Sequence, residues 1–368
     1  MKEQFLNVFK DVTKYGTKIP KENYLMKGKY PIFDQGQEYI AGYTNEENGI
    51  YSDVPIILFG DHTRIIKYID VPCFLGADGV KLLKAKKENA NYKYLYYALC
   101  HAHIPNTGYN RHFKWLKEIN IIFPSNEEQQ KIAAVLDKVS DLIALRKKQL
   151  EKLEELVKAR FVEMFGDLRL NKKNWETGVL SNYYSIKGGK RIPKGMGYSK
   201  NITSHPYLRT TDMKNATILD DDIRYIDDNV FEHIKNYTVK KGDIYLTNVG
   251  VNLGMAGIIP DKYDGANLTE NAVKFVPKKQ KVHNTLFLVY YINSYEIQNY
   301  INERKMSVGV PKLAIFRIET IPIKLPPLKL QEQFADFVTK VDKQKLTIQQ
   351  SLAKLEVLKK ALMQQYFG

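Results

Sequence analysis

The chain has 368 residues, of which 44% are apolar, and it carries a formal net charge of +15. This composition excludes wholesale disorder, the length allows two or three domains, and the basic charge favours a polyanionic partner such as nucleic acid. Two cysteines, Cys73 and Cys100, are too few for a disulfide framework or a four-thiolate zinc site, and no apolar run approaches the roughly 18 residues of a membrane span. We therefore expect a cytoplasmic protein without membrane association.

Residues 1–123 predict a first globular domain, rich in short β-strands. Apolar runs at 54–60 and 73–83 predict strands joined by turns, and the Tyr-rich segment 92–102 predicts a helix late in the domain. Pro124 then marks the change from extended chain to helix, because proline suits the N-terminal end of a helix.

Residues 124–166 predict a single long helix, the first helical spacer. Ser125 with Glu127 and Glu128 favours a helix start, and Gly166 favours its end. Apolar residues recur at alternating steps of four and three, which is the heptad seam of a coiled coil. The apolar seam positions are Ile132, Leu136, Val139, Ile143, Leu150, Leu153 and Val157.

Residues 167–325 predict a second globular domain, and residues 326–368 predict a second helical spacer. Strands are expected at 242–250 and 271–277, followed by one helix at 285–301. The second spacer has a heptad seam of its own. Its apolar positions are Phe334, Val338, Val341, Ile348, Leu352, Leu355 and Leu362.

An internal repeat relates the two spacers. When the chain is shifted by 202 residues, 14 of the 43 positions in 124–166 are identical, among them Pro124/Pro326 and Gln129/Gln331. Unrelated sequences would share about two or three, so the chain contains a duplication. The polar interruptions of one seam fall where the other seam is apolar, which favours pairing of the two spacers with each other.

A weaker repeat relates the globular domains. Residues 14–21 lie over residues 187–194, and Gly76-Ala77-Asp78 resembles Gly265-Ala266-Asn267. We therefore expect an α+β fold with a pseudo-two-fold internal repeat, in which two mixed α/β globular domains are separated by two long helices.

The basic excess is concentrated in the globular domains. Residues 167–328 carry 24 basic and 16 acidic residues and residues 1–125 carry 17 and 13, whereas residues 126–166 carry eight of each. In the expected loops, basic side chains alternate with aromatic and amide side chains, which are the types that contact phosphates and base edges in DNA. The candidate DNA-contact residues are Lys18, Gln35, Gln37, Arg64, Tyr109, Asn110, Arg111, Lys114, Lys187, Lys190, Arg191, Lys194, Tyr198, Lys200, Arg209, Lys214, Asn248 and Asn252.

Catalytic motifs are scarce in this sequence. It has no Walker loop, no G-x-G-x-x-G, no G-x-S-x-G and no N-P-P-Y/F tetrapeptide of amino-methyltransferases. Pro260-Asp261 followed by Glu303-Arg-Lys305 is a faint match to a Mg²⁺-dependent nuclease, and Cys100-His101-Ala-His103 has no second ligand pair close in sequence. We therefore expect neither catalytic residues nor a metal site in this chain.

Two helical repeats, NIIFPSNEEQQKIAAVLDKVSDLI and IPIKLPPLKLQEQFADFVTKVDKQ, and the stretches GDIYLTNVG and Gly309-Val-Pro-Lys-Leu313 are similar to those of a known family. Over essentially its whole length, the chain resembles the specificity (S) subunits of type I restriction-modification systems. The resemblance implies that residues 1–123 and 167–325 are target recognition domains, each reading one half of a bipartite double-stranded DNA sequence. It also implies that the spacers form an antiparallel coiled coil that fixes the distance between the halves.

The same resemblance implies partners and cofactors. Two methyltransferase (M) subunits would bring S-adenosylmethionine and methylate adenine, and restriction (R) subunits would use ATP and Mg²⁺ to translocate and cut DNA. The chain itself would be non-catalytic and would need no cofactor. The alternatives are a stand-alone DNA nuclease or methyltransferase and a coiled-coil protein scaffold. The sequence leaves open the bases recognised, the length of the gap, the presence of an R subunit and the oligomeric state without partners.

Overall fold

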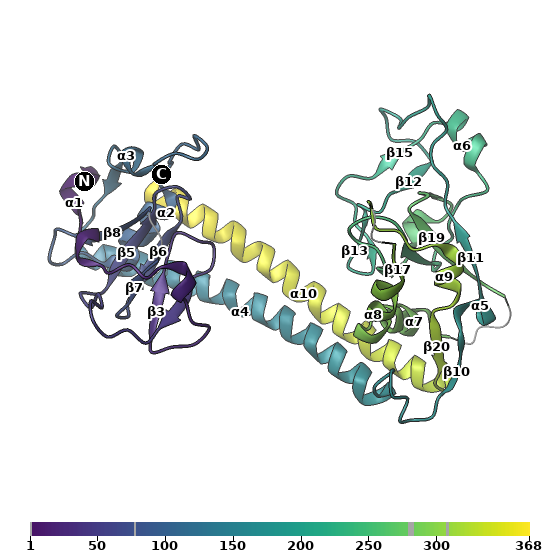
Figure 1. Ribbon diagram of the computed structural model, residues 1–368. Coiled ribbons are helices and arrows are strands. Elements are labelled where there is room, and N and C mark those ends of the chain that lie inside the picture. Colours follow the sequence, from purple (N-terminus) through teal and green to yellow (C-terminus); the bar gives the residue numbers. More distant parts are fainter. Residues whose placement is uncertain (1, 77–78, 279–282, 307–308) are drawn as a thin grey trace. The chain divides into compact units, whose positions relative to one another are not determined.

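The structure is a computed structural model that describes residues 2–76, 79–278, 283–306 and 309–368 (Figure 1). The chain divides into two compact units: unit 1 consists of residues 1–150 and 347–368, and unit 2 of residues 151–346. Each unit therefore contains one globular domain and a part of each long helix. None of the described helices is both long and apolar enough to cross a membrane.

Unit 1 contains a four-stranded antiparallel sheet and a smaller three-stranded sheet. The larger sheet has the order β2-β8-β5-β6, and the smaller has the order β4-β3-β7, in which β3 and β7 are parallel. The strands are β1 (Lys2–Gln4), β2 (Phe9–Asp11), β3 (Tyr30–Phe33), β4 (Gly42–Thr44), β5 (Ile56–Gly60), β6 (Ile66–Ile69), β7 (Phe74–Leu75), β8 (Val80–Ala85) and β9 (Asn120–Ile122), which pairs with β1. The helices are α1 (Phe5–Val8), α2 (Tyr92–His101) and α3 (Phe113–Leu116), with 3-10 turns η1 (Thr13–Tyr15) and η2 (Lys21–Asn23).

Unit 2 repeats this arrangement of strands. Its four-stranded sheet has the order β11-β19-β16-β17, its three-stranded sheet has the order β15-β12-β18 with β12 and β18 parallel, and β10 pairs with β20. The strands are β10 (Glu176–Val179), β11 (Tyr184–Gly188), β12 (Pro206–Leu208), β13 (Met213–Lys214), β14 (Thr217–Ile218), β15 (Arg224–Tyr225), β16 (Ile244–Thr247), β17 (Ala256–Ile258), β18 (Asn267–Leu268), β19 (Ala272–Pro277) and β20 (Pro322–Leu325). The shorter helices are α5 (Leu180–Tyr183), α6 (Asp228–Ile234), η3 (Asp261–Tyr263), α7 (Thr285–Ile292), α8 (Tyr295–Arg304) and α9 (Ile315–Glu319).

Strand register shows which residues of the two domains correspond. Phe33 of β3 pairs with Leu75 of β7, and Leu208 of β12 pairs with Leu268 of β18. Leu75 therefore corresponds to Leu268, and the residue after it, Gly76, corresponds to Thr269. By this correspondence Gly76 does not match Gly265, as the sequence match of Gly76-Ala77-Asp78 to Gly265-Ala266-Asn267 would require. Residues 77 and 78 lie outside the described residues.

The prediction of one helix at 285–301 is wrong. The structure has two helices, α7 and α8, separated by Asn293 and Ser294. The Asn293 side chain accepts a hydrogen bond from the Ala256 N–H and donates one to the Ala256 carbonyl oxygen, both at 2.9 Å. Ser294 is extended and occupies the N-cap position of α8. The helix breaks because Asn293 is bonded to the edge strand β17, and Asn and Ser readily adopt such capping positions.

Two long helices, α4 (Asn126–Phe165) and α10 (Leu328–Phe367), each contain 40 residues and are about 60 Å long. The Glu128 N–H donates to the Ser125 hydroxyl at the start of α4, and Gly166 ends it with a positive φ of 76°. Both helices lie within the predicted spacers. The predicted domain boundaries themselves stay predictions.

Within each unit, α4 and α10 run antiparallel. In unit 1, Ile132 and Leu136 from the start of α4 share a core with Leu362 from the end of α10. In unit 2, Phe161 from the end of α4 packs edge-on against Phe334 from the start of α10, at 5.4 Å between ring centroids. Every apolar seam position predicted from the sequence is buried or half-buried in the structure.

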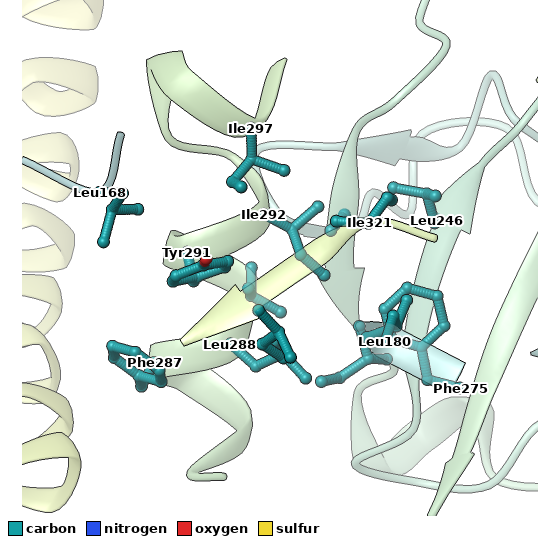
Figure 2. Close-up of a cluster of buried hydrophobic side chains, with 14 of the residues drawn as sticks. Leu168, Leu180, Leu246, Phe275, Phe287, Leu288, Tyr291, Ile292, Ile297 and Ile321 are labelled. Carbon is teal, nitrogen blue, oxygen red and sulfur yellow. The ribbon is translucent and has the colours of Figure 1, made fainter. Parts of the chain in front are cut away.

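The helix ends are part of the domain cores. In unit 2, Phe287, Leu288 and Tyr291 of α7 pack with Leu180 and Phe275 (Figure 2). The ring of Phe287 also lies 4.6 Å from that of Phe165 in α4. In unit 1, Phe367 of α10 lies 5.2 Å from Tyr94 of α2. Such aromatic pairs contribute roughly 0.5–1.5 kcal/mol each beyond their buried area. Aromatic packing therefore fixes the end of α4 in the core of unit 2 and the end of α10 in the core of unit 1.

A buried glutamine joins each long helix to its domain. Gln129 donates to the Pro124 carbonyl oxygen at 2.9 Å and accepts from the Asn91 N–H at 3.0 Å. Gln331 makes the same two bonds, to the Pro326 carbonyl oxygen and from the Asn284 N–H, both at 2.8 Å. Asn91 and Asn284 are the N-cap residues of α2 and α7. The repeated proline and glutamine of the sequence are therefore explained by a duplicated hydrogen-bonded junction.

Candidate nucleic-acid interface

Candidate residues gather in both domains where the two parallel strands end. Residues 34–37 follow β3 in unit 1 and residues 209–212 follow β12 in unit 2, at corresponding positions. We call these segments strand-end loop 1 and strand-end loop 2. Loops beyond the carboxyl ends of parallel strands are frequent ligand sites, since the strands hold the loop ends together.

Strand-end loop 1 is held by Asp34 and Lys67. The Asp34 carboxylate accepts from the Gly36 N–H at 2.7 Å, and the Lys67 ammonium, 3.6 Å from Asp34, donates to the Glu38 carbonyl oxygen at 2.6 Å. Burial, opposed by the neighbouring Asp34 carboxylate, lowers the pKa of Lys67. Gln35 accepts from a neighbouring backbone N–H at 3.1 Å. The loop is thus held by the buried Lys67, which was not among the residues predicted from the sequence.

A second loop of unit 1, residues 104–112, lies beside strand-end loop 1. Tyr109 is 87% exposed, and its ring stacks on His62 at 4.7 Å. The His62 backbone N–H is the donor to the Gln35 side chain. Asp61 holds the C-terminal end of loop 104–112. Its backbone carbonyl accepts from the His112 N–H at 2.8 Å, and its carboxylate accepts from the Phe113 N–H at 2.7 Å. Gln35 and Tyr109, which are far apart in sequence, are therefore brought together through His62.

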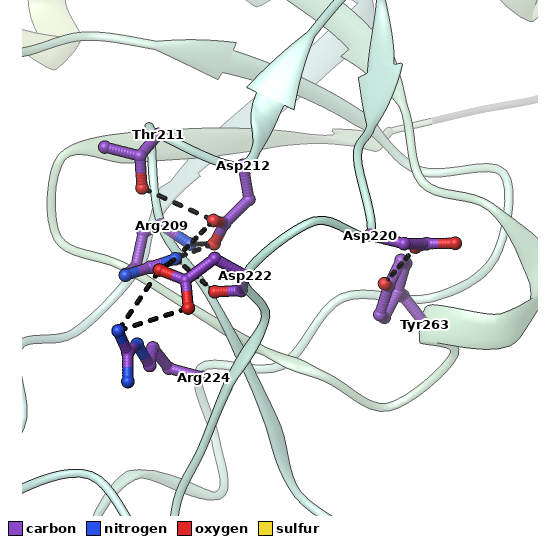
Figure 3. Close-up of polar contacts among 7 residues, drawn as sticks. All are labelled: Arg209, Thr211, Asp212, Asp220, Asp222, Arg224 and Tyr263. Carbon is purple, nitrogen blue, oxygen red and sulfur yellow. Dashed lines mark hydrogen bonds and ion pairs between the residues drawn. The ribbon is translucent and has the colours of Figure 1, made fainter. Parts of the chain in front are cut away.

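Arg209 opens strand-end loop 2 and is engaged with acidic residues (Figure 3). Its guanidinium donates to both carboxylate oxygens of Asp212, at 3.1 and 2.7 Å, and to Asp222 at 3.2 Å. Arg224 lies 3.1 Å from the same Asp222 carboxylate. The hydrogen bond from Arg209, opposed by burial, lowers the pKa of Asp222. A base contact by Arg209 would break these bonds, so the structure favours a role in holding the loop.

Arg191 has one carboxylate partner at the same edge of unit 2. Its Nε donates to Glu270 at 2.6 Å, while 78% of the Arg191 side chain is exposed. Glu270 also accepts from the hydroxyl groups of Thr269 at 3.1 Å and Tyr207 at 3.4 Å. These residues border a cavity of about 360 Å³ that Tyr198 and strand-end loop 2 also line.

Glycines let the preceding loops approach this edge closely. A Cβ added to Gly189 in unit 2 would lie 2.1 Å from the Thr269 carbonyl oxygen. It would also lie 2.2 Å from the carbonyl oxygen of Leu268, and a Cβ added to Gly16 in unit 1 would lie 2.6 Å from the side chain of Leu75, which corresponds to Leu268. Glycine is thus needed at position 189, because the chain passes directly over the backbone of the parallel strand, whereas at position 16 a Cβ would meet only side-chain atoms.

The structure separates the sequence candidates by exposure. Those with exposed side chains are Lys18, Gln37, Tyr109, Asn110, Arg111, Lys114, Lys187, Lys190, Arg191, Lys194, Tyr198, Lys200, Lys214 and Asn252. Those that are buried or half-buried are Gln35, Arg64, Arg209 and Asn248. The Arg64 guanidinium donates to the Ile104 carbonyl oxygen at 3.1 Å.

Asn248 is only 6% exposed, which corrects the expectation of an accessible loop residue. Its backbone carbonyl accepts from the Leu313 N–H at 2.8 Å, and its amide donates to the Leu313 carbonyl oxygen at 3.4 Å. This contact joins the end of β16 to the segment before α9, as Asp61 joins β5 to the segment before α3. Asn248 lies near the end of the strand predicted at 242–250 and was expected to be accessible there, but the strand end is covered.

The residues of the faint nuclease match lie on separate elements. Asp261 begins η3, and Glu303, in α8, is paired with Arg304 at 3.2 Å. Among the described residues no group of three or more His, Cys, Asp or Glu side chains is placed to hold a metal ion.

Sequence comparison identifies the class of protein. The family model described as the type I restriction modification DNA specificity domain matches residues 7–155 and 172–358. These matches cover most of the chain, so the chain belongs to this family, and the family predicted from the sequence is confirmed.

Two curated relatives illustrate the similarity. The type I restriction enzyme MjaIX specificity subunit of Methanocaldococcus jannaschii is 25% identical over 265 residues, which are 67% of this chain and 60% of that protein. The EcoR124I/EcoR124II specificity subunit of Escherichia coli is 27% identical over 251 residues, which are 61% of this chain and 58% of that protein. The matched part thus spans about three fifths of the length of these relatives.

Solved structures share the fold. The crystal structure of a type I restriction-modification S subunit from M. genitalium superposes with a TM-score of 0.63 at 18% identity, covering 100% of this chain and 96% of that one. A chain from a structure describing complex assembly and conformational transition of the type I system gives a TM-score of 0.55 at 14% identity, covering 99% and 95%. The predicted fold class, two mixed α/β domains with long antiparallel helices, is therefore confirmed.

Proposed function

We propose that this chain reads a bipartite double-stranded DNA target, with one half-site for each globular domain. The main support is the contrast between a duplicated frame and divergent loops. Both domains have the same strand order, yet the corresponding positions 34–37 and 209–212 carry Asp-Gln-Gly-Gln and Arg-Thr-Thr-Asp. A protein that recognises two different half-sites can use the same strand arrangement twice, with different side chains in the loops that contact the bases.

We also propose that the chain is non-catalytic and that its partners supply the chemistry. Two M subunits with S-adenosylmethionine would methylate the target, and R subunits with ATP and Mg²⁺ would cut DNA, all in the cytoplasm. The duplicated junctions at Gln129 and Gln331 support a pair of similar partners, because they create similar surroundings at the start of each long helix. The scarcity of catalytic motifs supports chemistry carried out by other chains.

The test is methylation sequencing of a cell that expresses this chain with an M partner. The expected result is a bipartite methylated sequence with unread bases between its halves. Replacing residues 167–325 by the corresponding domain of a relative should change one half and leave the other unchanged. Changes in both halves would contradict independent reading.

The purified chain alone serves as the control. Methylation or cleavage of DNA by this chain without partners would support the stand-alone enzyme instead. Absence of salt-dependent DNA binding, both alone and with M, would support the protein scaffold, because phosphate contacts make binding strongly dependent on salt.

A further inference from the structure

In the Arg191–Glu270 pair the carboxylate binds Nε of the arginine, whereas the other arginine–carboxylate pairs of unit 2 use a terminal guanidinium nitrogen. Glu270 accepts from Nε of Arg191, and no other described residue is bonded to the guanidinium. The two terminal nitrogens therefore remain available as a fork. Arg209 provides the contrast, since Asp212 and Asp222 engage its terminal nitrogen as well as Nε.

Glu270 is itself held in place. One carboxylate oxygen accepts from Arg191, and the other accepts from Thr269 and Tyr207. The single hydrogen of the Tyr207 hydroxyl is shared between Glu270 at 3.4 Å and the Lys190 carbonyl oxygen at 2.8 Å, which joins the carboxylate to the backbone next to Arg191. Burial alone would raise the pKa of Glu270, but the hydrogen bonds from Arg191 and Thr269 outweigh it and the pKa lies below its ordinary value. The carboxylate is thus charged and fixed at neutral pH.

An arginine in this setting suits a base edge better than a phosphate. A carboxylate bonded to the guanidinium would repel a phosphate oxygen placed beside it. Guanine presents two acceptors, O6 and N7, to the major groove, and these match two terminal guanidinium nitrogens. Adenine presents one donor and one acceptor there, so the same fork would lose a bond. The cytosine paired with guanine has an amino donor, which a nearby carboxylate tolerates.

We propose that Arg191 is a specificity-determining residue that reads a guanine in the half-site of unit 2, and that Glu270 is the positioning residue that orients its guanidinium. This inference rests on the proposed function and deepens it. It assigns guanine to one position of the target. It also gives a role to the Glu270 carboxylate, because a negative charge would otherwise have no use on a DNA-binding surface.

The test compares variants of the full chain, expressed with an M partner, by methylation sequencing. Wild type should show a G·C pair at one position of the half-site set by residues 167–325. Arg191→Ala and Arg191→Lys should reduce discrimination at that position about 5- to 150-fold, which corresponds to the loss of roughly 1–3 kcal/mol for a bidentate contact. The other half-site should not change.

Glu270 is tested by a graded series. Glu270→Ala should relax the same position as Arg191→Ala, and the double variant should add little to either single one, because both remove one contact. Glu270→Gln keeps an acceptor oxygen and should restore part of the preference. A residue with only a structural role would instead weaken every position of the half-site, with no recovery in Glu270→Gln.

The control is the Arg304–Glu303 pair in α8 of the same domain, a half-buried arginine that also bonds the Tyr300 carbonyl oxygen and an exposed glutamate. Arg304→Ala should leave the half-site unchanged. A bipartite target without a G·C position in this half, or unchanged discrimination in Arg191→Lys, would overturn the inference while leaving the proposed function intact. Absence of any bipartite target in wild type would overturn the proposed function first.

Discussion

The strand-end loops of the two domains are held by ion pairs of opposite polarity. The first residue after the strand is an acid in unit 1, Asp34, which lies near the buried Lys67. The corresponding residue in unit 2 is a base, Arg209, which is bonded to Asp212 and Asp222. The shared strand arrangement thus keeps an ion pair at the same position in both domains, but the charge of the first loop residue is reversed. Loop sequences can diverge widely in such a frame, provided that each half-buried charge has a partner.

Removing Asp212 tests this comparison with the largest expected effect. Asp212→Ala leaves Arg209 with one exposed partner and should destabilise unit 2 by about 3 kcal/mol, since a buried pair is broken. Asp34→Ala should cost about 1 kcal/mol, because Asp34 is more exposed and its lysine also bonds a carbonyl. Urea unfolding, with hydrogen exchange to separate the units, measures both.

The corresponding control removes the whole pair. Arg209→Met combined with Asp212→Leu should recover most of the stability lost in Asp212→Ala, because no buried charge remains. Equal losses for Asp212→Ala and Asp34→Ala would contradict the difference in burial between the two loops.

Acid should weaken unit 2 through His283. Burial lowers the pKa of His283 from 6.5 to about 4. Between these values the unfolded chain binds a proton that the folded chain does not, so stability falls as pH drops through 6.5 and the loss is complete below about 4. The full loss is about 3 kcal/mol. Hydrogen exchange at several pH values should show the effect in unit 2, and His283→Phe should remove it from this window.

The duplicated glutamines allow a test of whether the two helix–domain junctions contribute equally to stability. Gln129→Ala and Gln331→Ala should each cost about 2 kcal/mol, since each leaves a backbone N–H and a carbonyl oxygen without the side-chain partner. Thermal unfolding should show similar shifts for both. The neighbour Gln130, which is exposed and bonds only within α4, is the control and should cost less than about 0.5 kcal/mol on substitution by alanine. A large difference between the two buried glutamines would show that the junctions are not equivalent.

The smallest effect is expected on the helices. Lys147 pairs with Glu356 at 3.5 Å with both side chains more than half exposed, so Lys147→Ala should change stability by less than about 0.5 kcal/mol. It should also leave DNA affinity nearly unchanged, whereas Arg111→Ala in the exposed loop of unit 1 should lower it. Equal losses in a salt titration would place DNA contacts on the helices as well.

Local signals in the sequence were sufficient for the long helices and for a few buried strands such as β5, β16 and β19. Ser125, Gly166 and the heptad seam act within a few residues of the feature that they define, so they can be recognised without the fold. The break at Asn293 could not be found in this way, because its partner Ala256 is 37 residues away in sequence.

The candidate interface was predicted only in part, because residue types can be recognised in the sequence but their long-range partners cannot. Basic and amide side chains such as Arg191 and Gln35 stand out by type, and the structure places them at corresponding edges. Glu270, Asp61 and Lys67 were missed, because a DNA-binding surface suggests exposed basic side chains and not the buried or half-buried charges that hold its loops. Their roles become visible only in their contacts, from Glu270 to Arg191, from Asp61 to His112 and from Lys67 to Asp34.

Unit 1 is built from two segments separated by 196 residues of unit 2, and this affects how the chain can fold during synthesis. At roughly 5–20 residues per second, residues 1–150 wait about 10–40 s for the segment that completes their core. Until Phe367 reaches Tyr94, the surface that it covers stays open to solvent or to a chaperone. Unit 2, which is continuous, can fold in the meantime. Residues 347–368 therefore complete a domain whose larger part, residues 1–150, is synthesised before unit 2.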